Sequence, residues 1–201
     1  QKEIVRIETE LASDKMMGRA IFTDGIGLAS DFIENEFKKI GLHYFDNLKS
    51  YRQDFVVDGK NANNVIGILP GKSKLGEYVI FSAHYDHLGL VDAVNDGDDV
   101  VYNGANDDAS GTTAVIALAK YFKELNQNER TIVFVAFTGE EVGGFGSAFF
   151  SKNIDPNKVV AMFNIEMIGT ESKWGKNSAY ITGFEKSNFG TILQKNLKKK
   201  I

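Results

Sequence analysis

Three short runs of β-branched and aromatic residues constrain the fold of this chain more than any other feature of its sequence. They span residues 78–83, 131–137 and 159–165. Runs of this length and composition are typical of strands that are buried on both faces of a parallel sheet. Segments with helical periodicity lie between them, so the order of the elements predicts an α/β fold. We expect a mainly parallel, mixed central sheet with helices on both faces.

The helical segments are recognised by the spacing of their apolar residues. In residues 112–125, for example, Val115, Leu118 and Phe122 fall on one face of a helix with 3.6 residues per turn. We expect helices over residues 1–12, 25–42, 112–125, 147–152 and 187–200, further strands over 51–57, 63–69 and 178–183, and a surface loop over 89–104.

Size and charge narrow the class of protein. The 201 residues fit one α/β domain. The net charge of −4 gives none of the basic surface that a nucleic-acid partner requires. No apolar stretch is long enough to span a membrane. Since the chain contains no cysteine, any metal ion must be held by oxygen and imidazole ligands.

Acidic residues and a histidine follow the three apolar runs at the point where each run ends. His84 and Asp86 follow the first run, Glu140 and Glu141 follow the second after a Thr-Gly turn, and Glu166 follows the third. In open α/β sheets the ligand crevice lies beyond the carboxyl ends of the strands. We therefore expect these side chains to converge on a divalent metal ion and to perform metal-assisted hydrolysis.

Two adjacent aspartates, Asp107 and Asp108, precede the helix predicted over 112–125. Neighbouring carboxylates repel unless a positive charge lies nearby, and a metal ion would supply it. A solvated helix N-terminus, where acids are favoured, is the simpler alternative, and Asp108 or Ser110 is a candidate cap. Glu166 is harder to explain in this way, because apolar residues flank it and a buried carboxylate needs a partner or a metal.

The chemistry of these side chains suggests their roles. His84 is the expected metal ligand, and Asp86 is the expected partner that fixes the tautomer of its imidazole. Of Glu140 and Glu141, one could bind the metal while the other accepts a proton from the attacking water. His87 ranks below His84 as a ligand, because its sequence context suits a structural residue in a turn.

The ordered set of motifs resembles the M28 family of zinc aminopeptidases. The motifs are H-x-D at 84–86, N-D-D-A-S-G at 106–111, G-E-E-x-G-G-F-G-S at 139–147 and N-I-E-M-I-G at 164–169. The segments L-A-S-D-K-M-M-G-R and N-N-V-I-G-I-L-P-G also resemble that family. Each motif alone is weakly specific, whereas the set in this order is specific and extends over most of the chain.

The resemblance implies a zinc-exopeptidase-like fold and a site for two zinc ions. His84 would bind one zinc ion, Asp107 would bridge the two, and Glu141 would bind the second. Glu166 stands at the position of a further ligand to the first ion. Glu140 matches the general base of the family.

Asp86 matches the acidic partner of the family's histidine ligand, but two features depart from the family pattern. The family's usual residue at the position of Glu166 is aspartate, which is one methylene shorter. A final histidine ligand is also expected, yet no residue after Glu166 is a histidine. We therefore expect residues 1–201 to be a single zinc-peptidase-like domain without its C-terminal strands and last ligand. Such a chain would hold one or two zinc ions, with the second site incomplete.

The function that the resemblance implies is that of an aminopeptidase, an exopeptidase that removes N-terminal residues from peptide substrates. The alternatives left open are a single-zinc glutaminyl cyclase, a carboxypeptidase-like specificity and a binding domain that has lost its metal. Members of this family are often secreted or periplasmic, so we expect an exported protein whose signal peptide has been removed. The sequence indicates neither the preferred N-terminal residue nor the oligomeric state.

Overall fold

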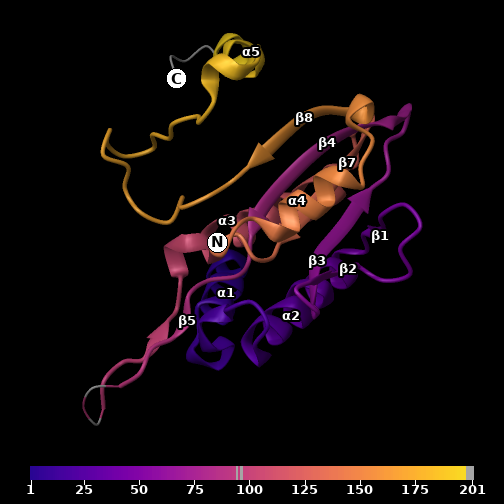
Figure 1. The fold of residues 1–201 in the computed structure, drawn as a ribbon. Helices are drawn as coiled ribbons and strands as arrows, with labels where there is room; N and C mark the ends of the chain where they lie inside the picture. Colours follow the sequence, from indigo (N-terminus) through magenta and orange to yellow (C-terminus); the bar gives the residue numbers. More distant parts are fainter. Residues whose placement is uncertain (94, 96, 198–201) are drawn as a thin grey trace.

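The computed structural model describes residues 1–93, 95 and 97–197 of the chain (Figure 1). Among these residues, six strands form one sheet in the order β1-β3-β7-β4-β8, with β2 paired to β3 beside this path. The strands are β1 (His43–Tyr44), β2 (Arg52–Val57), β3 (Lys60–Leu69), β4 (Lys74–His84), β7 (Arg130–Phe137) and β8 (Val159–Asn164).

Parallel pairing is confined to the three strands whose ends carry the predicted site. β4 lies between β7 and β8 and is parallel to both. β3 is antiparallel to β7, and β1 and β2 are antiparallel to β3. The mixed sheet of the predicted α/β class is confirmed. Because His84 is in register with Phe137 and both strands end there, the residues that follow leave the sheet at one edge.

Helices cover both faces of the sheet. α1 (Lys2–Leu11), α2 (Asp24–Ile40) and α3 (Ser110–Leu125) contribute apolar residues to one core cluster, and α4 (Phe145–Lys152) contributes to another. Alternate residues of β7 face the two clusters: Phe134 belongs to the first, and Val133 and Val135 belong to the second. All three side chains are fully buried, as the uninterrupted apolar run predicts.

The helix ends follow from local chemistry. α2 stops at Gly41, which adopts the left-handed conformation with a φ of 75° that favours glycine. The turn η2 (Ala105–Ala109) leads directly into α3, which begins at Ser110. Asp108 accepts a hydrogen bond of 2.9 Å from the main-chain N–H of Gly111, which satisfies a donor at the start of the helix.

The loop expected over 89–104 contains regular structure in part, and the strand expected over 178–183 is wrong. The expected loop over 89–104 contains a two-stranded hairpin of β5 (Gly89–Leu90) and β6 (Val101–Tyr102), which projects from the body of the molecule (Figure 1). The segment 178–183 forms no strand; no described strand lies beside it to supply main-chain hydrogen bonds. The remaining elements are η1 (Asp14–Arg19), η3 (Pro156–Lys158), η4 (Phe184–Lys186) and α5 (Phe189–Leu197).

The last predicted helix is present as α5, and the end of that prediction, residues 198–200, lies outside the described residues. No helix within the described part of the chain has both the length and the apolar character needed to cross a membrane. In the mixed sheet, the ends of the parallel strands β4 and β7 place His84, Glu140 and Glu141 at one edge.

Candidate metal centre

Three segments meet at the carboxyl edge of the parallel strands. His84 is the last residue of β4. The turn after β7 carries Glu140 and Glu141, and the η2 turn before α3 carries Asp107. The peptide bond between Asp107 and Asp108 is cis. The strand-end placement predicted from the sequence therefore brings residues from distant parts of the chain to one place.

His84, Asp107 and Glu141 form a triad that could hold a metal ion. One ligand atom from each residue lies within 4.8 Å of the others. The Nε2 atom of His84 is buried and makes no hydrogen bond. It lies 3.0 Å from Oδ1 of Asp107, but the contact lacks hydrogen-bond geometry. One imidazole and two carboxylates fit a divalent metal, because catalytic zinc sites commonly use three protein ligands and one open position.

The contacts of Nδ1, the other ring nitrogen of His84, indicate which of the two nitrogens can bind a metal. Nδ1 lies 3.1 Å from the main-chain carbonyl oxygen of Asp86 and 3.6 Å from its carboxylate. A proton on Nδ1 therefore donates to the carbonyl, so in the neutral imidazole Nε2 is the nitrogen that offers a lone pair to a metal. The sequence predicts that Asp86 fixes the tautomer of His84. In the structure the main-chain carbonyl of Asp86 is closer to Nδ1 than its carboxylate is.

The carboxylate of Asp86 orients the turn after β7. Its two oxygens accept hydrogen bonds of 3.1 Å and 3.2 Å from the main-chain N–H groups of Glu140 and Glu141. The side chain is buried, and these two donors satisfy its oxygens. Asp86 thus joins the end of β4 to the turn that carries the two glutamates.

His87 is a neighbour of the triad that the sequence ranked low. Its Nδ1 lies 2.8 Å from Oε1 of Glu141, within hydrogen-bond distance. A proton on Nδ1 would make Glu141 the acceptor and hold its carboxylate in place. His87 follows His84 by only three residues, and nothing in that spacing distinguishes a ligand from a residue that orients one.

Asp108 serves the structure of the site. Besides the N–H of Gly111, its carboxylate accepts hydrogen bonds from the N–H groups of His84 (3.3 Å) and Met167 (3.2 Å). The side chain at position 111 must be absent, because a Cβ there would lie 2.2 Å from the carbonyl oxygen of Ile165. Asp108 therefore connects the end of β4, the start of α3 and the segment after β8.

Glu166 lies outside the triad. The sequence placed it among core residues, but the structure leaves it exposed, and its neighbour Met167 is also exposed. Among the described residues, β8 pairs along one edge, with β4. This explains why a strand with the composition of a core strand has exposed residues. The role of Glu166 as a metal ligand stays a prediction.

Glu140 stands beside the triad as an exposed carboxylate. Partial burial of its carboxyl group raises its pKa, and the charges of Glu166 and Glu141 act in the same direction, while His84 opposes them. A raised pKa makes a carboxylate a better proton acceptor near neutral pH. The role of Glu140 as general base stays a prediction.

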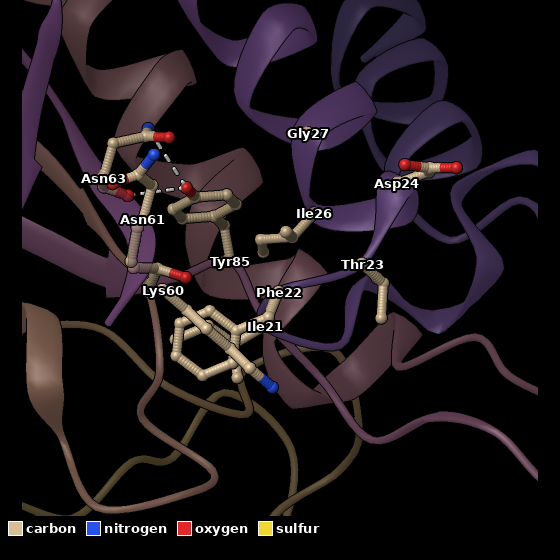
Figure 2. A pocket seen from close by; sticks show the side chains of 12 residues that line it. Ile21, Phe22, Thr23, Asp24, Ile26, Gly27, Lys60, Asn61, Asn63 and Tyr85 are labelled. Carbon is tan, nitrogen blue, oxygen red and sulfur yellow. Dashed lines mark hydrogen bonds between the residues drawn. The ribbon is translucent and has the colours of Figure 1, made fainter. Parts of the chain in front are cut away.

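A cleft borders the strand ends. It has a volume of about 410 Å³ and lies between the start of α2 and the start of β3 (Figure 2). Tyr85, the residue between His84 and Asp86, forms part of its wall, and its hydroxyl group donates a 2.7 Å hydrogen bond to the carbonyl oxygen of Asn63. The remaining lining residues include Ile21, Phe22, Ile26, Lys60 and Thr138.

We expect the metal-free chain to lose stability as the pH rises from about 4 to about 9. Burial raises the pKa of Asp108 from 3.8 to about 7. Burial opposes the charged form of His84, but its contacts with Asp86 and Asp108 raise its pKa from 6.5 to about 9. The folded chain therefore keeps protons that the unfolded chain has released.

For His84, this contribution to stability is fully present below the unfolded pKa of 6.5 and is lost as the pH rises through about 9. The buried carboxylate of Asp108 adds to the loss between 3.8 and about 7. Urea unfolding in the presence of a chelator, at about pH 5, 7 and 9, measures the effect. A denaturation midpoint that increases over this range would contradict the assignment.

We expect Asp86→Asn to destabilise the fold by about 1–3 kcal/mol and to weaken metal binding by about 10-fold or more. Both oxygens of Asp86 accept main-chain N–H groups, so an amide would place its NH₂ against one of these donors. Urea unfolding and a zinc titration measure the two effects. Asp54→Asn, an exposed position on β2, is the matched control; equal behaviour of the two variants would disprove the role of Asp86.

The sequence matches a known protein family. The profile of peptidase family M28 matches residues 64–199. This range exceeds half of the chain and contains all three residues of the triad.

The curated relatives that the chain matches include a probable zinc metalloprotease and an aminopeptidase. A probable zinc metalloprotease of Pyrenophora tritici-repentis is 29% identical over 160 residues, which cover 75% of this chain and 32% of the relative. Aminopeptidase YwaD of Bacillus subtilis is 30% identical over 123 residues, which cover 59% and 24%. The chain thus spans a third or less of the length of these curated relatives.

Solved structures share the fold. LapB of Legionella pneumophila superposes with a TM-score of 0.62 at 23% identity, covering 85% of this chain and 44% of that one. A Zn-dependent exopeptidase of Parabacteroides distasonis gives 0.60 at 18% identity, covering 85% and 62%. The glutaminyl cyclase of Bacteroides thetaiotaomicron gives 0.66 at 19% identity, covering 98% and 70%. Likeness at these identities concerns the fold alone, and it confirms the predicted zinc-exopeptidase-like fold.

The family match and the fold agree with the resemblance that the ordered motifs carry. The motifs at 84–86, 106–111 and 139–147 all lie within the matched range. These three motifs supply the residues that the structure brings together at one edge of the sheet. The chain belongs to peptidase family M28.

Proposed function

We propose that this chain belongs to a zinc-dependent aminopeptidase, an exopeptidase that hydrolyses N-terminal residues from peptides. The observation that carries this proposal is the triad, in which a buried His84 Nε2 without a hydrogen bond faces the carboxylates of Asp107 and Glu141. The names of the curated relatives, a probable zinc metalloprotease and an aminopeptidase, support the metal and the reaction.

His84, Asp107 and Glu141 would hold the zinc. Zinc in such a site lowers the pKa of water towards about 7 and polarises a carbonyl group. We propose Glu166 as a further ligand in a site that holds one or two zinc ions.

The protein's own residues would then move the proton and keep the site in shape. Glu140 accepts a proton from the attacking water and passes it to the leaving amine, a task that its raised pKa favours. Asp86 holds the turn that carries Glu140 through two main-chain hydrogen bonds. His87 holds the carboxylate of Glu141.

Chromogenic substrates test the reaction class. The zinc-loaded protein should hydrolyse aminoacyl p-nitroanilides with a free amine and should leave the N-acetylated analogues intact, and a chelator should abolish the activity. Cleavage from the C-terminus of a peptide would indicate a carboxypeptidase instead. Ammonia release from a peptide with N-terminal glutamine would indicate a cyclase. A zinc-loaded protein that turns over none of these substrates would support a binding domain. Export of the protein stays a prediction.

A further inference from the structure

Arg19 is an unusual buried charge near the metal centre. Its side chain is fully buried, and the hydrogen-bond partners of its guanidinium group are main-chain carbonyl oxygens. A buried cation is costly unless its donors are satisfied. Burial lowers the pKa of Arg19 to about 10, although the charges of Asp86 and Glu8 oppose the shift, so the group remains charged at neutral pH.

The carbonyl groups belong to the loops that carry the triad. Nε of Arg19 donates to the carbonyl oxygen of Tyr85 at 2.9 Å, and Tyr85 lies between His84 and Asp86. Nη1 and Nη2 donate to the carbonyl oxygens of Asn103 and Gly104 at 2.7 Å and 2.9 Å. These two residues come directly before the η2 turn, which carries Asp107. One guanidinium group therefore joins the two segments that supply His84 and Asp107.

The main chain around Arg19 makes a third connection. The carbonyl oxygen of Arg19 accepts a 3.2 Å hydrogen bond from the N–H of His87, the residue that contacts Glu141. Gly18 packs directly against Gly89, since a Cβ at Gly18 would lie 2.2 Å from the carbonyl oxygen of Gly89. This close contact seats Arg19 beside the turn after β4.

We infer that Arg19 is a positioning residue of the metal centre, which holds the loops of His84 and Asp107 at the spacing that metal binding requires. It does not belong to the triad and acts through the main chain of the residues that do. The inference rests on the proposed function, because its readout is the affinity for zinc. It goes beyond that function, because Arg19 would position the main chain around the metal ligands and would not itself bind the metal.

Arginine suits this task for a geometric reason. Its guanidinium group is a planar fork with five N–H donors, so it can reach carbonyl oxygens on opposite sides at the same time. Lysine carries the same charge at a single nitrogen atom and cannot span these acceptors. Arg19→Lys therefore keeps the positive charge but removes the planar set of donors, and Arg19→Met removes both.

The test is a zinc titration of the wild-type chain, Arg19→Lys, Arg19→Met and the control Arg130→Lys. Arg130 pairs with Glu77 at the start of β7, at the opposite end of the strand from the site. We expect both Arg19 variants to bind zinc about 10–100-fold more weakly, as losses of outer partners commonly do, and the control to bind as the wild type does. The visible absorption of the Co²⁺-substituted chain should change in the Arg19 variants and not in the control.

Circular dichroism and urea unfolding establish which variants are folded. If the Arg19 variants do not fold, Asn103→Ala decides: the Asn103 side chain donates to the carbonyl oxygen of Ala12 at 2.9 Å and to Asp14 at 2.8 Å, and its loss should loosen the same loop and weaken zinc binding several-fold. Folded Arg19 variants, or in their absence a folded Asn103→Ala, with wild-type zinc affinity and Co²⁺ spectrum would overturn the inference. A wild-type chain that binds no zinc would instead refute the proposed function.

Discussion

Glu140→Gln should lower the rate of hydrolysis by about 10²–10⁴-fold while the zinc content stays that of the wild type. Glutamine has the size of glutamate but cannot accept the proton of the attacking water. Glu140 lies outside the triad, and its contact with Asp86 uses its main-chain N–H, so the substitution leaves the ligands and the turn in place. The rate on an aminoacyl p-nitroanilide and the zinc content, measured on one preparation of the protein, check both parts.

Glu124→Gln is the matched control, because Glu124 is an exposed glutamate near the end of α3. Its activity should equal that of the wild type. Undiminished turnover by Glu140→Gln would remove Glu140 as the base. Loss of zinc together with activity would show that Glu140 acts on the metal site and not as a proton acceptor.

His84→Ala and Asp107→Asn should each weaken zinc binding by more than the roughly 10–100-fold that loss of an outer partner costs. His84→Ala removes the only imidazole of the triad. Asp107→Asn removes a negative charge without changing the size of the side chain. Competition with a chromophoric chelator measures the affinities.

Two exposed positions provide controls for these variants. His43→Ala on β1 matches His84→Ala, and Asp54→Asn on β2 matches Asp107→Asn. Both controls should bind zinc as the wild type does. Wild-type affinity in His84→Ala or in Asp107→Asn would show that the triad is not the zinc site.

The part of this site that follows from sequence is the part set by strand ends. The apolar runs place β4 and β7, and parallel strands bring His84 and the Glu140-Glu141 turn to one edge. The aspartates before α3 reach the same edge through contacts of the folded chain, since the carboxylate of Asp108 accepts a hydrogen bond from the main-chain N–H of His84. Periodicity predicts the positions of His84, Glu140 and Glu141, whereas the metal-binding role of Asp107 is predicted from the resemblance to the family.

The residues that hold this site together could not be predicted in the same way. Arg19 reaches Tyr85 and Gly104 across 66 and 85 residues of sequence, and its partners are carbonyl groups that every residue possesses. Asp108 likewise binds main-chain N–H groups. Such contacts leave no pattern of residue types, so only the folded chain reveals them.

The predicted burial of β8 is wrong for a related reason. The run before Glu166 has the composition of a core strand, but burial depends on neighbours on both sides. In the structure β8 has a partner along one edge, and its residues Val160 and Met162 are exposed. Composition alone does not report how many neighbours a strand has.

The zinc content of the purified chain tests the central claim most directly. The chain is equilibrated with Zn²⁺, and gel filtration removes loosely held metal. The zinc content is then measured by inductively coupled plasma mass spectrometry, with His84→Ala treated in parallel. We predict about one or two zinc ions per wild-type chain and a clear loss in His84→Ala. A folded wild-type chain without zinc, or a His84→Ala variant with the same content as the wild type, would contradict the account.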